Sequence, residues 1–135
     1  MLRTRRSEIV DVVADLLAKR QAKQLLTWDA NRLPAPGLLD GLQRRGYTCV
    51  AAELSCQPKA RHTHLKSLAE IEVGITGAGG AIADIGALVM PGGEGQGRLA
   101  SLLPPVHVAL VTPDQFYPTL EAWVATQQDL TMFDN

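Results

Sequence analysis

The N-terminal part of the chain carries a helical pattern of apolar positions. Residues 7–20 place apolar side chains three and four positions apart, at Ile9, Val12, Val13, Leu16 and Leu17. This spacing gathers the apolar side chains on one face and predicts an amphipathic helix, for which Ser7 is a suitable N-terminal cap. Pro36 is placed to start a second helix. Gly46, which follows Arg44 and Arg45, is a typical stop signal and predicts the end of that helix.

Strand-like runs alternate with these helices. Short apolar runs at 24–28 and 48–54 predict two buried strands, and residues 65–71 predict a short third helix after a polar stretch at 55–63. The order helix, strand, helix, strand, helix is typical of an α/β fold. The pattern therefore predicts a single α/β domain with a mostly parallel sheet flanked by helices, whose first half covers residues 1–70.

The second half, residues 71–128, is rich in glycine. Nine of the 12 glycines lie between residues 74 and 97, around a strand-like run at 81–90, and a second run follows at 106–111. Helical spacing after Pro113 predicts a last helix over 114–128. The side chains expected to face inward from it are Phe116, Leu120, Trp123 and Val124. Residues 129–135 carry no pattern, and we expect this tail to fray.

Length and charge limit the kind of protein. The 135 residues suffice for one domain with its own core, and the 46% hydrophobic content argues against long disorder. Lys and Arg number 13 against 14 Asp and Glu, and aromatic residues make up 4%, so neither a basic footprint nor a stacking platform for nucleic acid is present. No apolar run approaches the roughly 18 residues of a membrane span. We expect neither nucleic acid nor membrane among the partners.

Cysteines and the N-terminus bear on the compartment. Cys49 and Cys56 are the only cysteines, and their spacing matches no zinc or iron–sulfur pattern, so we expect a reducing, cytoplasmic location and no metal bound by this chain. The basic start resembles a signal peptide, but Glu8, Asp11 and Asp15 interrupt the apolar region that a signal peptide requires. The sequence therefore favours a first helix over a leader.

The glycine-rich loop at 92–98 is the first candidate site. Glycine allows the backbone to approach a ligand closely, and successive N–H groups form a concave anion site. Arg98 ends the loop ahead of a helical turn, so this segment is either a cradle for phosphate or carboxylate or a flexible turn with a surface arginine. The candidate ligand-binding residues are Gly77, Gly86, Gly92, Gly93, Gly95, Gly97 and Arg98.

The same loop also matches the glycine spacing of dinucleotide-binding turns. Gly95-x-Gly97-x-x-Ala100 has this spacing, and Asp114 lies 19 residues after Gly95. That motif needs a full helix, whereas about six residues precede Pro104 here, so the sequence disfavours dinucleotide binding.

Asp84 is the candidate catalytic residue. It interrupts the apolar run 81–90, where a buried carboxylate needs a hydrogen-bond or charged partner. Backbone N–H groups, a pair with Arg98, or a role as general acid or base would each account for it. Among the histidines, His62 and His64 indicate a solvated loop, and His107 a packed, hydrogen-bonded strand residue.

Residues 74–111 resemble the LUD domain, the family of lactate-utilisation protein C. The matching stretches are Gly74-Ile-Thr-Gly-Ala78, Ala81-Ile-Ala-Asp84, Gly86, Gly95-Gln-Gly97-Arg98, Ser101-Leu-Leu-Pro104 and His107. Ile85 and Ala87 stand where the family usually has hydroxyl residues. Family members also continue beyond the segment that matches the end of this chain, so we expect a shortened member of the family, a fragment of one or a protein that lacks part of the site.

The resemblance implies a fold like that of the ribose-phosphate isomerase and CoA-transferase group. It also implies a cytoplasmic role in the oxidation of L-lactate to pyruvate, with the iron–sulfur clusters held by partner subunits and no cofactor held by this chain. It assigns site roles to Asp84, Gly86 and Arg98. A homo-oligomer is a further expectation, because a shortened sheet leaves an open edge.

Two other hypotheses stay open beside this one. The chain could be an independent isomerase or CoA-transferase-like enzyme with Asp84 as its base, or a non-catalytic binding or assembly module. Whether the chain is itself an enzyme differs among the three hypotheses. The leading hypothesis places Asp84 and the loop 92–98 in one common pocket.

Overall fold

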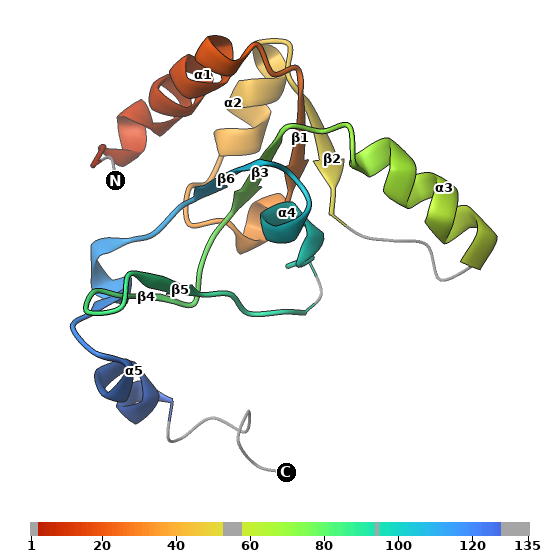
Figure 1. Ribbon diagram of the computed structural model, residues 1–135. Coiled ribbons are helices and arrows are strands. Elements are labelled where there is room, and N and C mark those ends of the chain that lie inside the picture. Colours follow the sequence, from red (N-terminus) through yellow and green to blue (C-terminus); the bar gives the residue numbers. More distant parts are fainter. Residues whose placement is uncertain (1–2, 53–57, 94, 128–135) are drawn as a thin grey trace.

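The computed structural model describes residues 3–52, 58–93 and 95–127 (Figure 1). Its main sheet has four strands in the order β2-β1-β3-β6, and all three neighbouring pairs are parallel. The strands are β1 Gln24–Thr27, β2 Thr48–Ala51, β3 Val73–Thr76 and β6 Val106–Ala109. The prediction of an α/β fold with a mostly parallel sheet flanked by helices is confirmed.

Four helices accompany this sheet. They are α1 Ile9–Arg20, α2 Leu38–Arg44, α3 Pro58–Leu68 and α4 Leu99–Leu102, with 3₁₀ turns at Arg6–Glu8 and Ala30–Arg32. Gly46 adopts a φ of 98° just after α2, as the stop signal predicts. The expected cap is wrong, because Glu8 precedes α1 without a side-chain capping bond.

The third helix begins seven residues earlier than the apolar pattern predicts, at Pro58 instead of residue 65. Proline suits the first turn of a helix, and the lysine and arginine that follow are good helix formers. The prediction relied on apolar side chains, and α3 has few of them. The polar stretch 55–63 is therefore helical from residue 58, so His62 and His64 lie in a helix and not in a loop.

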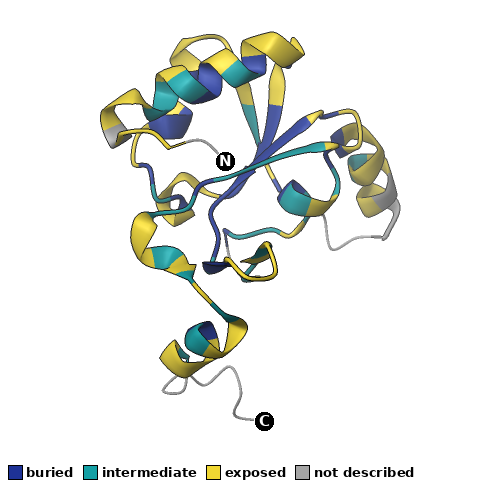
Figure 2. Cartoon of the chain, turned by 60° about the vertical axis from the view of Figure 1, so that its left-hand side comes forward, coloured by how far each residue is buried: buried dark blue, intermediate teal, exposed yellow. Residues whose placement is uncertain are grey.

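The centre of the core lies on the inner strands β1 and β3. Leu25, Leu26 and Ile75 are completely enclosed, and Val73 is 1% exposed. Figure 2 shows the dark blue of buried residues along these strands, whereas the edge strand β2 is partly exposed. Strands that are apolar on both faces are typical of a parallel sheet with covered faces.

A second, smaller sheet follows in the glycine-rich half. It has the order β5-β4-β7, with β4 Gly80–Ile82, β5 Ala87–Val89 and β7 Phe116–Tyr117. The prediction of one strand over 81–90 is wrong, because a turn at 83–86 folds this run into an antiparallel hairpin. Gly86 takes a φ of 62° in the turn, a conformation that glycine adopts without strain.

The predicted helix over 114–128 is also wrong in its first half. A 3₁₀ turn at Pro113–Gln115 and strand β7 precede a shorter helix, α5 Leu120–Thr126. Thr119 caps α5, since its Oγ1 accepts a hydrogen bond from the backbone N–H of Ala122 at 3.1 Å. Trp123 faces inward as expected, but Phe116, Leu120 and Val124 are exposed.

The expected tail at 129–135 lies outside the described residues. Among the helices that the structure describes, none combines the length and the apolar character needed to cross a membrane.

Candidate functional site

The carboxyl ends of β1 and β3 form the natural ligand position of the main sheet. The chain passes from β1 to β2 on one side and then returns to place β3 on the other side of β1. Where strand order reverses in this way, the loops after the two strands diverge, and open α/β sheets bind ligands in the crevice between them. Trp28 and Asp29 follow β1 here, and Gly77 follows β3.

The glycine-rich loop 92–98 is fastened to this edge of the sheet. Nε1 of Trp28 donates a hydrogen bond to the carbonyl oxygen of Gly97 at 3.2 Å. The backbone N–H of Asp29 donates a second one to the carbonyl oxygen of Gly95 at 2.9 Å. A further bond from the N–H of Gln96 to the carbonyl oxygen of Gly93, at 3.0 Å, closes a tight turn within the loop. Residues distant in sequence therefore hold the loop in one place.

Two of its glycines are required by space. A Cβ atom on Gly97 would lie 1.8 Å from the carbonyl oxygen of Ala52, directly after β2, and this backbone contact leaves no room for a side chain. Gly95 has a φ of 75°, and a Cβ there would lie 2.8 Å from Oδ2 of Asp29. The loop thus rests on the ends of β1 and β2 by direct backbone contact.

The guanidinium group of Arg98 folds back over its own loop. A Cβ atom on Gly92 would lie 2.8 Å from Nε of Arg98, so the side chain occupies the space beside Gly92. Arg98 is exposed and makes no ion pair among the described residues. Because the carbonyl group of Gly97 points to Trp28, the N–H of Arg98 in the same planar peptide points the opposite way. The exposed, cationic side chain of Arg98 is therefore available to an anion.

Sequence reasoning missed two residues of this edge, Asp29 and Arg32. Both are exposed, and Cγ of Arg32 lies 3.1 Å from the position of a Cβ on Gly95. The signal was present, since both residues come shortly after a buried strand, where parallel sheets carry their functional loops. The edge thus brings two arginines and one carboxylate around the glycine loop.

Asp84 and Gly86 are not part of this group. They lie in the turn 83–86 at the tip of the β4–β5 hairpin, whereas the loop 92–98 follows the far end of β5 (Figure 1). Asp84 is exposed, and its backbone N–H donates to the carbonyl oxygen of Pro118 at 3.2 Å. The expectations that Asp84 lies in a buried strand and shares a pocket with the loop are wrong, because the run folds back at the turn.

His107 is hydrogen-bonded within the sheet, as the sequence indicates. Its Nε2 lies 2.7 Å from Oγ1 of Thr76, which lies 2.7 Å from the carbonyl oxygen of Gly77. A carbonyl oxygen can only accept, so the threonine hydroxyl donates to Gly77 and Nε2 of His107 carries the proton that Thr76 accepts. Partial burial lowers the pKa of His107, which favours the neutral ring.

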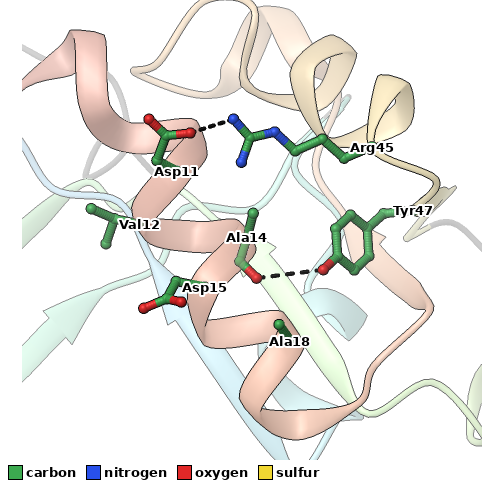
Figure 3. Close-up of a pocket in the computed structure, with 7 residues that line it drawn as sticks. All are labelled: Asp11, Val12, Ala14, Asp15, Ala18, Arg45 and Tyr47. Carbon is green, nitrogen blue, oxygen red and sulfur yellow. Dashed lines mark hydrogen bonds and ion pairs between the residues drawn. The ribbon is translucent and has the colours of Figure 1, made fainter.

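A hollow of about 620 Å³ lies elsewhere, against α1 (Figure 3). Its lining residues are Asp11, Val12, Ala14, Asp15, Ala18, Arg45 and Tyr47. Arg45 pairs with Asp11, and the hydroxyl of Tyr47 donates to the carbonyl oxygen of Ala14 at 3.4 Å. These contacts satisfy the polar groups and fasten the end of α2 to α1, so the hollow is structural.

The family model of the LUD domain matches residues 2–133, and the chain therefore belongs to the LUD domain family. The matched residues extend well beyond the glycine-rich block and include both halves of the chain.

Curated relatives agree with this membership. The chain is 26% identical over 118 residues to lactate utilization protein C of Halalkalibacterium halodurans. The matched segment covers 87% of this chain and 48% of that protein. The chain is also 35% identical over 78 residues to lactate utilization protein B of Shouchella clausii, and this match covers 58% of this chain and 16% of that protein. Lactate utilization protein B of Bacillus velezensis is 35% identical over 72 residues, and this match covers 53% of this chain and 15% of that protein. The chain thus spans half of these relatives' length or less. No solved structure matches.

Proposed function

We propose that this chain contributes to the oxidation of L-lactate to pyruvate in the cytoplasm and binds a small carboxylate anion at the loop 92–98. The observation that carries the proposal is the position of Arg98. Its guanidinium group, which forms no ion pair with the residues that the structure describes, lies over Gly92, on a loop held at the carboxyl ends of β1 and β2. Arginine presents a planar set of donors that matches a carboxylate.

The names of the matched relatives support the lactate role and suggest a system of several subunits. Oxidation of L-lactate to pyruvate releases two electrons and two protons, which an acceptor must take up. The chain has two cysteines, whereas an iron–sulfur cluster takes four protein ligands, and no group of three His, Cys, Asp or Glu side chains comes together within the described residues. The residues present do not fit a cluster, so in this proposal the iron–sulfur clusters belong to partner subunits.

Within the site, Arg98 binds the carboxylate, and Arg32 adds a second positive charge beside Gly95. Asp29 lies on the same edge, where its carboxylate oxygen can accept a hydrogen bond from the hydroxyl group of a 2-hydroxy acid. Asp84 has no part in this arrangement. Isomerase or CoA-transferase activity based on Asp84 therefore lacks a supporting geometry.

Titration calorimetry with L-lactate and pyruvate tests the proposal. We expect Arg98→Ala to weaken binding by at least tenfold, since a charge-assisted hydrogen bond contributes roughly 1.5–3 kcal/mol. Arg98→Lys should retain part of the affinity. Arg20→Ala, which removes an exposed arginine at the end of α1, is the matched control and should bind as the unaltered chain does. Equal affinity in Arg98→Ala and in the control would refute the binding site.

A further inference from the structure

The charges of this chain are divided between its two halves. Residues 1–66 contain 12 of the 13 Lys and Arg residues and six of the 14 acids, whereas residues 67–135 contain eight acids and Arg98 alone. The net charge of −1 conceals this asymmetry. Surfaces of opposite charge on one molecule would favour the attraction of one copy to the next.

The basic part includes a helix that stands apart from the fold. The sequence of α3 contains Lys59, Arg61 and Lys66 and no acid. Figure 1 shows α3 at the side of the molecule, and it has no extensive contact with any other helix or strand of the described chain. Among its described side chains only Leu68 is deeply buried, and Leu65 is 36% exposed. An isolated helix of 11 residues is marginally stable in water, so a partner that packed on α3 would stabilise it.

The acidic part consists of the small sheet and α5, which we call the C-terminal unit. It comprises residues 80–89, which form the β4–β5 hairpin, and residues 113–127, which include β7 and α5. Its charged residues are Asp84, Asp114 and Glu121, all exposed. The unit also carries five of the seven exposed large apolar side chains described, at Ile85, Leu88, Phe116, Leu120 and Val124. Exposed apolar side chains with polar residues around them are typical of protein-binding sites.

These two surfaces cannot meet within one molecule. Figure 1 shows α3 and α5 at opposite ends of the chain's fold. Arg61 and Lys66 form no ion pair within the described residues, and neither do Asp84 and Glu121. The cations of one copy can therefore attract the acids of another without breaking an ion pair that the described residues form.

We propose that copies of this chain associate head to tail, with the basic helix α3 of one copy docked on the acidic, apolar C-terminal unit of the next. Such a contact joins two different surfaces, so it produces a ring or an open chain instead of a closed twofold dimer. The charges select the partner and its orientation, and burial of the exposed apolar side chains adds stability.

Sedimentation velocity over a range of protein concentrations tests this proposal. We expect the weight-average sedimentation coefficient to rise with concentration at low ionic strength and to fall on addition of salt, because salt screens exposed charges. Arg61→Glu/Lys66→Glu should weaken association by tenfold or more, and so should Asp84→Lys/Glu121→Lys. A chain that stays monomeric at every concentration and at low salt would overturn the proposal.

Mixing the two double variants gives the decisive result. Each one alone repels its own copies, but the reversed helix of the first complements the reversed unit of the second, so we expect the mixture to associate. The matched control is Arg20→Glu/Lys23→Glu, which changes the net charge by the same amount at exposed positions outside both surfaces and should associate as the unaltered chain does. Circular dichroism checks that every variant is folded. A folded mixture that stays monomeric, or a control that dissociates equally, would refute the assigned surfaces.

Discussion

The hydroxyl group of Thr76 joins strand β3 to His107 on strand β6. Its oxygen is 2.7 Å from Nε2 of His107 and 2.7 Å from the carbonyl oxygen of Gly77, and Thr76 is completely buried. One hydroxyl group thus satisfies two polar groups at the point where β3 ends and the next loop begins.

Replacement of Thr76 by valine should destabilise the fold by about 1–3 kcal/mol, because it leaves the Nε2–H of His107 and the carbonyl group of Gly77 without their partner. Urea unfolding measures the loss. Thr76→Ser keeps the hydroxyl group and should lose much less. Equal stability of the valine and serine variants would show that the hydroxyl group contributes nothing.

The stability of the fold should decrease as the pH falls below 6.5, in part because of His107. Burial lowers the pKa of His107 from its usual 6.5, so in this range the unfolded chain binds a proton that the folded chain does not. The contribution of the neutral His107 ring to the free energy of unfolding is complete above pH 6.5. It is lost as the pH falls from 6.5 towards the lower pKa of the folded state. Urea unfolding at several pH values, with His107→Gln for comparison, measures it. The variant should show a shallower pH dependence, and an identical dependence would contradict the prediction.

Substitution of Gly97 should displace the glycine loop, whereas substitution of Gly93 should not. A Cβ on Gly97 would lie 1.8 Å from a backbone oxygen, but on Gly93 the nearest atom is the flexible Oε1 of Gln96 at 3.4 Å. We expect Gly97→Ala to cost at least about 1–3 kcal/mol, as overpacking does, and to weaken carboxylate binding. Thermal unfolding and titration calorimetry compare the two variants. Similar behaviour of both would show that the close contact at Gly97 is not limiting.

The thiol of Cys49 should react slowly with iodoacetamide. Burial and, to a smaller extent, the carboxylate of Asp40 raise the pKa of this thiol, so less of it is in the reactive thiolate form. Measured in a Cys56→Ser background, its alkylation rate should fall well below that of free cysteine at the same pH. Asp40→Asn should increase the rate modestly. A rate equal to that of free cysteine would contradict the assigned environment.

The helix α1 and the end of α2 were predictable because their signals are local. The apolar spacing of α1 and the stop at Gly46 depend on neighbouring residues, and both are seen in the structure. The hairpin at 83–86 was not predictable in this way, since apolar residues continue through the turn and periodicity could not separate its two strands. Only the pairing of β4 with β5 and β7 distinguishes them.

The candidate site also combines residues that the local sequence indicates with residues that only the fold brings together. Composition alone identified the glycine loop and Arg98, because clustered glycines and an arginine are visible in any reading of the sequence. Asp29 and Arg32 join them only through the order of the strands in the sheet, which depends on contacts between residues far apart in the chain. For the same reason Asp84, close to the loop in sequence, lies away from it in space.

The indole ring of Trp28 contacts the loops after both β3 and β5: a Cβ on Gly77 would lie 3.2 Å from its ring, and its Nε1 binds Gly97. The other tryptophan, Trp123, packs against Gly80 in the C-terminal unit. The protein therefore contains two tryptophan fluorophores, one at the edge where we propose that an anion binds and one buried within the unit that we assign to self-association. Replacing either by phenylalanine isolates the emission of the other, so ligand capture and assembly can be followed separately without an added label.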